Sequence, residues 1–289
     1  MTRYYKVSGK QIDILKQDWD ILVILDACRY DIFKEEYKEI LGGRLKKAIT
    51  PATFTVEWLN KIFNGVYLDD TVYISGTVFN NSQGICPIHK GYRFDGRKHF
   101  KKVIDVWDWG WDYELGTVHP KEMNKAALVA NDLHRNKRLI IHYMQPHSPY
   151  LCYGGSKRER GDKRMVIKTD NPLRYWLKEP WKSPLFTPIR KVLKTDKQRW
   201  TLGGLLGALP DGSTGDIFYR YGRIGLIRGY RENLKLVLEY LKKLIEISPN
   251  KNYLITADHG ERLLEEGNFG HGGARDREVV EVPWLELEV

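Results

Sequence analysis

Near its C-terminus the chain carries an acidic and a basic side chain next to each other, after an apolar run and before a glycine. Asp258 and His259 stand in the sequence ITADHGERLLEEGNFGHGG (255–273), and a second histidine, His271, follows between two glycines. A carboxylate oxygen and an imidazole nitrogen are common ligands of zinc and manganese. We therefore predict a divalent metal site here. The simpler alternative is a capping aspartate beside a surface histidine.

Two other polar residues also follow apolar runs. Asp26 lies near the end of DILVILDA (20–27), and His147 follows KRLIIHYMQ (137–145), much as Asp258 ends KNYLITAD (251–258). Segments with helical spacing alternate with such runs, at 29–41, 55–63, 119–136 and 215–247. This alternation predicts an α/β fold with a mostly parallel central sheet and helices on both faces. Ligands bind such sheets beyond the carboxyl ends of the strands, so we expect these side chains to meet at one edge.

The motifs resemble those of a known family. The pattern ADHGE…GHG followed by VEVPWLEL resembles the C-terminal signature of the alkaline phosphatase/sulfatase superfamily, and IIHYMQPHSPY (140–150) resembles its HxxxPHxPY segment. VILDACRYD (23–31) is similar to the family's first strand, and TPATFTVEWLNKIFNG (50–65) to its nucleophile helix. The resemblance covers about half of the chain. It implies an alkaline phosphatase-like fold, a nucleophile at Thr55 and a substrate-facing His147.

Departures from the family pattern narrow the expected activity. Sulfatases carry a Cys or Ser in a CxPxR-type motif, whereas the stretch TVEWL (55–59) has no Cys, Pro or Arg. Asp26 is followed by Ala27 where sulfatases carry paired aspartates, and no aspartate precedes His147 at the turn used by two-zinc phosphatases. The pattern is closest to that of the one-metal phosphoethanolamine and phosphoglycerol transferases, which use a threonine nucleophile.

The expected mechanism uses one divalent ion, zinc or manganese, together with a threonine nucleophile. A second bound ion is an alternative. The resemblance implies four metal ligands: Asp26, Thr55, Asp258 and His259. A threonine hydroxyl is a poor nucleophile until a bound cation lowers its pKa, and a helix N-terminus adds a favourable field. We expect His147 and His271 to act as catalytic groups that also bind substrate. Arg29 is a third candidate for substrate binding.

Simpler interpretations stand beside several of these assignments. Thr55 could be only the N-cap of its helix, and Thr50 and Thr53 are rival nucleophiles. His147 could be a packed loop histidine. Arg29 could pair with a carboxylate. Structural roles are also expected for two residues next to the motifs. His142 is predicted to be a buried, hydrogen-bonded strand residue. Glu261 could orient His259 or could be a solvated glutamate.

Composition and charge limit the class of protein and locate its basic segment. Hydrophobic residues make up 42% and charged residues 29% of the chain, which excludes a disordered protein. The net charge is +10, and residues 157–199 hold 14 Lys or Arg against 5 Asp or Glu, so one segment supplies most of the excess. We predict a single domain, 1–289, with a basic, aromatic-rich insertion at 152–212 over the site. Peripheral membrane contact through 157–199 is a further expectation.

Together these motifs indicate an enzyme that acts on an ester. The chain is predicted to be a metal-dependent hydrolase or transferase of a phosphoryl-containing ester, with an anionic substrate that could be lipid- or glycan-linked. One alternative is a sulfuric ester hydrolase. Another is a non-catalytic module that binds an anionic nucleic acid or membrane; no DNA- or RNA-binding motif favours nucleic acid. The absence of an apolar leader and the presence of only three cysteines favour the cytoplasm.

Overall fold

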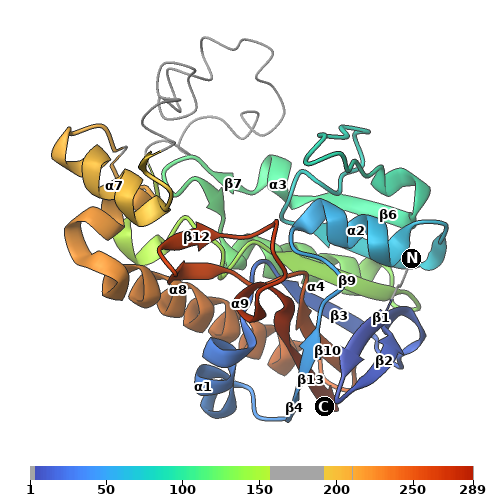
Figure 1. Cartoon of the computed structure of the whole chain (residues 1–289). Helices are drawn as coiled ribbons and strands as arrows, with labels where there is room; N and C mark the ends of the chain where they lie inside the picture. The colour runs from blue at the N-terminus through green and yellow to red at the C-terminus, as the bar shows by residue number, and fades with distance from the viewer. Residues whose placement is uncertain (1–3, 157–191, 210, 289) are drawn as a thin grey trace.

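A computed structural model describes residues 4–156, 192–209 and 211–288 of the chain. In these residues a nine-stranded sheet forms the centre of the molecule, in the order β2-β1-β4-β13-β10-β3-β9-β5-β6 (Figure 1). Its strands are β1 Tyr4–Val7, β2 Lys10–Asp13, β3 Ile21–Leu25, β4 Arg44–Ile49, β5 Leu68–Ser75, β6 Phe100–Asp105, β9 Arg138–Tyr143, β10 Asn252–Ala257 and β13 Glu281–Glu288. Two small sheets pair β7 Trp111–Asp112 with β8 Thr117–Val118, and β11 Arg262–Glu265 with β12 Asn268–Gly270.

The sheet is mixed, with a parallel half that carries the site. Strands β10, β3, β9, β5 and β6 are parallel neighbours, and β2, β1, β4 and β13 join antiparallel. All residues of β3 are buried, as expected for a strand covered on both faces. Because β3, β9 and β10 lie side by side, the residues after them reach the same edge. The α/β architecture predicted from the sequence is confirmed.

Helices cover both faces of the sheet. The long helices are α1 Tyr30–Ile40, α2 Thr55–Phe63, α4 Pro120–Leu133, α7 Asp196–Leu205 and α8 Thr214–Ile247, and the short ones are α3 Val106–Trp109 and α9 Arg277–Val280. On one face α4 packs on β9 and β5, and α8 contacts both α1 and α4. On the other face Trp58 of α2 packs edge-on against His142 of β9. None of the described helices is long and apolar enough to cross a bilayer.

Most predicted elements are found, with two instructive differences. Helix α2 occupies the predicted range 55–63. The segment 101–109, which its apolar pattern predicts to be one strand, divides into β6 and the helical turn α3, because the pairing of β6 with β5 ends at Asp105 and VWDW lies beyond it. Strands β1 and β2, which lie at one end of the sheet order, were not predicted.

The basic segment falls mainly outside the described residues. The expectations for 157–191 therefore cannot be compared with the structure. The described end of the predicted insertion 152–212 packs against the small β11–β12 sheet. Lys197 donates its amide to the carbonyl of Gly267, and Asp196 accepts the amide of Phe269 at 3.0 Å. Helix α7 is thereby fixed to the hairpin that leads to His271.

Candidate active site

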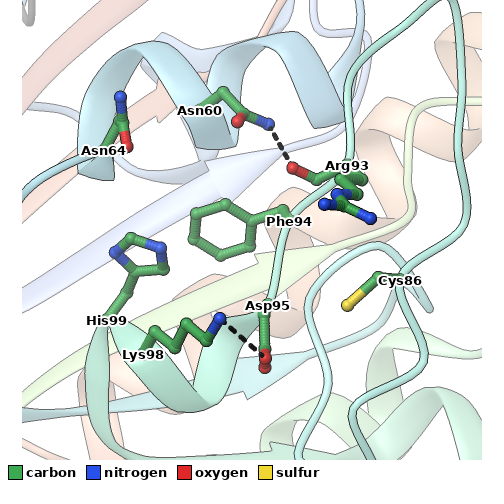
Figure 2. A pocket seen from close by; sticks show the side chains of 8 residues that line it. All are labelled: Asn60, Asn64, Cys86, Arg93, Phe94, Asp95, Lys98 and His99. Atoms are coloured by element: carbon green, nitrogen blue, oxygen red, sulfur yellow. Dashed lines mark hydrogen bonds and ion pairs between the residues drawn. The ribbon is translucent and has the colours of Figure 1, made fainter.

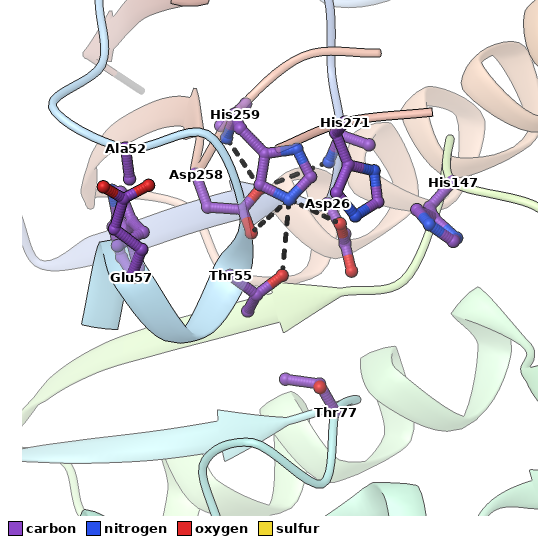
Figure 3. A network of polar contacts seen from close by, with 12 residues as sticks. Asp26, Ala52, Thr55, Glu57, Thr77, His147, Asp258, His259 and His271 are labelled. Carbon is purple, nitrogen blue, oxygen red and sulfur yellow. Dashed lines mark hydrogen bonds and ion pairs between the residues drawn. The ribbon is translucent and has the colours of Figure 1, made fainter. Parts of the chain in front are cut away.

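The imidazole of His259 is the centre of the site (Figure 3). Its Nε2 lies 3.3 Å from Oδ2 of Asp258, 3.5 Å from Oδ1 of Asp26 and 3.4 Å from the hydroxyl of Thr55. The other ring nitrogen, Nδ1, lies 2.9 Å from the carbonyl oxygen of Gly260, which accepts its proton. The Nε2 lone pair therefore faces three oxygen atoms. The structure brings together all four residues predicted as metal ligands.

Two of these oxygen atoms have no hydrogen-bond partner among the described residues. Oδ1 of Asp26 and Oδ2 of Asp258 are both buried and unpartnered. Burial raises the pKa of Asp26 well above its ordinary value, and the charge of Asp258 raises it further. A buried carboxylate without a donor is costly unless a cation meets it. The donor set of two carboxylates, an imidazole and a hydroxyl fits a divalent ion that accepts both oxygen and nitrogen.

Hydrogen bonds separate Thr55 from its rival threonines. The hydroxyl of Thr50 donates to the carbonyl oxygen of Asp258 at 2.6 Å, and that of Thr53 donates to the carboxylate of Glu57 at 3.0 Å. Both hydroxyls are thus engaged in holding the backbone around the site. Thr55 is the first residue of α2, and its hydroxyl faces His259. Of the three, only Thr55 presents its oxygen to the imidazole and the carboxylates.

The turns that carry the ligands are held from distant elements. Ala27 has a positive φ of 61°, its amide donates to Oδ1 of Asp258, and its carbonyl accepts from Tyr230 of α8. A Cβ on Gly260 would lie 2.1 Å from the carbonyl oxygen of Glu278, so only glycine fits there. Strand ends, α8 and the α9 turn together place Asp26 beside Asp258.

A second cluster of titratable groups lies next to the first. Nδ1 of His271 is 2.9 Å from Oε1 of Glu261, and Nε2 of His147 is 3.9 Å from Oε2 of the same carboxylate. The His271 ring lies 4.2 Å from the His259 ring and 5.2 Å from the His147 ring, centre to centre. Burial opposes the ionisation of Glu261, but the charge and the hydrogen bond of His271, together with the charges of His147 and His259, hold the Glu261 pKa below its ordinary value. This cluster could hold a second ion.

The structure shows the partners of the DHGE glutamate and of Arg29. Glu261 binds His271 rather than His259, because the partner of His259 Nδ1 is a backbone carbonyl. Arg29 is buried, and its guanidinium donates to Asp31, to Glu265 and to the Glu261 carbonyl. The structure therefore contains the carboxylate pairing that was the alternative interpretation of Arg29, and a substrate contact by Arg29 stays a prediction.

His142 and Lys90 lie close to the site without having been assigned to it. His142 is fully buried and bonded to Tyr73 at 2.7 Å, as predicted for a strand histidine, but its Nε2 also lies 3.8 Å from Oδ2 of Asp258. Burial lowers the pKa of His142, which keeps it neutral at neutral pH. Lys90 places its ammonium 5.0 Å from the ring centre of Phe54, the residue before Thr55. No motif indicated Lys90, because a lone lysine in a loop carries no spacing signal.

A cavity of about 190 Å³ opens on these residues, and a separate cavity lies elsewhere on α2. The first is lined by Asp26, Thr55, His147 and His271 together with apolar side chains. The second, about 360 Å³, lies at the far end of α2 and contains Asn60, Asn64, Arg93 and Cys86 (Figure 2). Its one carboxylate, Asp95, is paired with Arg97. The second cavity holds none of the predicted site residues, so we assign the site to the first.

Comparison with known proteins identifies the architecture. The soluble domain of lipooligosaccharide phosphoethanolamine transferase A from Neisseria meningitidis matches with a TM-score of 0.50 and 14% identity, over 92% of this chain and 75% of that one. The integral membrane protein itself matches with a TM-score of 0.51 and 14% identity, over 94% of this chain. The chain has the alkaline phosphatase/sulfatase-like fold. No protein-family model and no curated protein matches the sequence.

The comparison also shows how much of the transferase this chain corresponds to, and it corrects the predicted cellular location. The chain with this alkaline phosphatase-like fold spans about half, 48%, of the length of the integral membrane transferase. The C-terminal periplasmic domain of phosphoethanolamine transferase EptC from Campylobacter jejuni matches with a TM-score of 0.45 and 13% identity, over 92% of this chain and 78% of that one. The prediction of a cytoplasmic protein is contradicted, because the neighbour with a TM-score of 0.51 is an integral membrane protein.

Proposed function

We propose that this chain is a metal-dependent hydrolase or transferase of a phosphoryl-containing ester, with Thr55 as the nucleophile. One observation carries the proposal: the buried Nε2 of His259 faces two unpartnered carboxylate oxygens and the Thr55 hydroxyl within 3.5 Å. A non-catalytic protein has no need for two adjacent buried carboxylates that each leave one oxygen without a hydrogen-bond partner beside a hydroxyl. Asp26, Thr55, Asp258 and His259 would hold one divalent ion, zinc or manganese.

The chain's own groups supply the rest of the chemistry. When bound, the ion polarises a phosphoryl oxygen and favours ionisation of the adjacent hydroxyl. Thr55 sits at the N-terminus of α2, where the helix field stabilises its alkoxide and an incoming anion. Attack by the Thr55 oxygen on phosphorus forms a phosphothreonine and releases the first alcohol. Water or a second alcohol then takes the phosphoryl group and restores the hydroxyl.

The second cluster serves the leaving group and the phosphoryl oxygens. Glu261 fixes the His271 ring through Nδ1, so that ring is held for donation from Nε2. His147, at the mouth of the same cavity, keeps a quarter of its side chain exposed and can reach a substrate that enters from solvent. Should a second ion bind, His147, Glu261 and His271 would be its ligands. Measured metal content of one or two per chain decides between these arrangements.

We further propose that the insertion 152–212 contacts the larger, lipid- or glycan-linked part of the substrate. The support is the docking of α7 on the hairpin that leads to His271, together with the excess of basic residues in 157–199. Deleting 157–191 should weaken binding to anionic vesicles and leave the turnover of small nitrophenyl esters intact. Unchanged vesicle binding would contradict this assignment.

An ester panel tests the proposed function. Nitrophenyl phosphate, bis-nitrophenyl phosphate and nitrophenyl sulfate are each assayed with chelator, zinc or manganese. Asp258→Ala should abolish turnover, whereas Asp132→Ala, which removes an exposed carboxylate paired with Arg135, should not. Turnover of a phosphate ester that needs metal and Asp258 supports the proposal. Preferential turnover of the sulfate, or turnover that survives Asp258→Ala, contradicts it.

A further inference from the structure

The cavity at the site has two walls of different chemistry. One wall holds the groups of the proposed reaction. The other is made mostly of apolar and aromatic side chains: Val78, Phe79, Trp107, Trp111 and Met144, with Thr77 beside them. Thr77 lies on a loop across from Thr55 (Figure 3). A group attached to the phosphorus of a bound substrate must therefore lie against one wall or the other.

The fold builds the apolar wall at the same sheet edge as the site. Thr77, Val78 and Phe79 follow β5, Trp107 stands in the turn after β6, and Met144 follows β9. Val78 and Trp107 are 6% and 3% exposed, so their positions are fixed by packing. Trp111 is held in β7, which pairs with β8. The wall is thus formed before any ligand arrives.

Charge and size indicate what this wall accepts. Among the described residues that line the cavity, Asp26 is the only carboxylate, and no lysine or arginine is present. The apolar wall therefore offers no ionic partner, and its polar side-chain groups are the hydroxyl of Thr77 and the indole N–H groups of Trp107 and Trp111. The whole cavity, including the part beside Thr55 and Asp26, is about 190 Å³, and an apolar cavity of about 150 Å³ holds a benzene ring, so the group against the apolar wall can be no larger than about one ring. One ring or a branched alkyl group fits.

We propose that this wall is a specificity pocket for an uncharged apolar group, an aryl or branched alkyl, attached to the reacting phosphorus. The inference rests on the proposed phosphoryl chemistry at Thr55, because that chemistry places the phosphorus beside the wall. It names a substrate class that neither the metal ligands nor the nucleophile determines. The residues that define it are Phe79, Trp107 and Trp111.

Calorimetric titration of the metal-loaded protein with phosphonates tests the pocket without relying on turnover. Phenylphosphonate should bind about tenfold more tightly than methylphosphonate, because the ring buries apolar surface against the wall. In Trp111→Ala this preference should fall to less than threefold. Trp109→Ala is the matched control: Trp109 is 56% exposed, lies in the same segment and does not line the cavity, so the preference should persist.

A second pair of ligands separates apolar contact from recognition of a cation. Aromatic rings can also hold a quaternary ammonium. 3,3-Dimethylbutylphosphonate and its trimethylammonium isostere have nearly the same shape and differ in charge. Tighter binding of the neutral compound supports the proposal, and tighter binding of the ammonium compound overturns it. Where Trp111→Ala perturbs folding, Trp111→Leu takes its place. This variant keeps an apolar side chain in β7, so it should retain the preference for the neutral compound.

The outcomes distinguish this inference from the proposed function. Equal affinity for methyl- and phenylphosphonate overturns the pocket alone, since the phosphonate group is still bound at the site. Failure of every phosphonate to bind the metal-loaded protein overturns both. A preference for phenylphosphonate that Trp111→Ala leaves intact also overturns the pocket, because the ring is then recognised elsewhere.

Discussion

The hydroxyl oxygen of Thr55 lies 3.4 Å from Nε2 of His259, although the two residues are 204 positions apart in the sequence. One begins α2, and the other follows the parallel strand β10. This contact places the proposed nucleophile within the set of metal ligands rather than beside it. Any change to Thr55 should therefore alter both metal affinity and chemistry.

The first prediction concerns the choice of nucleophile. Thr55→Ala should reduce turnover of the preferred phosphate ester by about 10³-fold or more, because the covalent step is lost. Thr55→Ser keeps an oxygen at the site and should retain a measurable fraction of activity. Thr53→Ala is the control, since its hydroxyl is bound to Glu57 and only local stability should fall. Equal loss in Thr53→Ala and Thr55→Ala would remove the assignment.

The second prediction is a change of sign in stability. Asp26→Asn should stabilise the metal-free protein by about 1 to 3 kcal/mol, because it removes a buried carboxyl group whose ionisation both burial and the charge of Asp258 oppose. The same variant should be less stable than wild type when saturating zinc or manganese is present, since a ligand is lost. Urea denaturation with chelator and with metal measures both effects. Destabilisation of the metal-free protein would show that Asp26 stabilises the fold for another reason.

The third prediction concerns the orientation of His271. Glu261→Gln should lower kcat by about 10- to 100-fold, as expected when a buried carboxylate no longer fixes a functional histidine. One tightly bound metal should remain, because His259 uses the Gly260 carbonyl for its own Nδ1. Metal content and steady-state kinetics are measured on the same samples. A variant that loses all metal would instead make Glu261 a ligand of the principal ion.

The fourth prediction follows from the pKa of His259. Burial lowers that pKa from 6.5 to about 4. Between these two pH values His259 is therefore protonated in the unfolded chain and neutral in the folded chain. Between pH 6.5 and 4 this difference should cost the metal-free protein up to about 3 kcal/mol of unfolding free energy. Above pH 6.5 the imidazole is neutral in both states and the effect vanishes. His259→Asn should lack this pH-dependent loss of unfolding free energy. Denaturation curves of the two proteins are measured at each pH, and the difference between them gives the contribution of His259.

The sequence indicated which side chains would lie near one another, whereas the proposed ligand set of Asp26, Thr55, Asp258 and His259 was implied by the family resemblance. Asp26 and Asp258 each follow a short apolar run of the kind found in buried parallel strands, and such strands end at one edge of the sheet. The range of α2 was predicted from its apolar spacing after a proline and a threonine-rich turn. These assignments depend on short sequence patterns that can be recognised without knowledge of the rest of the chain.

The remaining features depend on contacts between distant segments. Val78, Trp107 and Trp111 are indistinguishable from core residues in the sequence, and only the positions of β5 and β6 show that they line a cavity. The partner of Arg29 was left open because Glu265 lies 236 positions away. The bond between Glu261 and His271 depends on the turn of the β11–β12 hairpin, which carries no apolar periodicity.

The most direct test of the account is detection of the covalent intermediate. Metal-loaded protein is mixed with bis-nitrophenyl phosphate, quenched in acid within milliseconds to seconds, digested and examined by mass spectrometry. We predict a nitrophenyl-phosphoryl group on the peptide that contains Thr55, absent with chelator and absent in Thr55→Ala. Rapid turnover with no adduct on Thr55, or an adduct on another residue, would contradict the central claim.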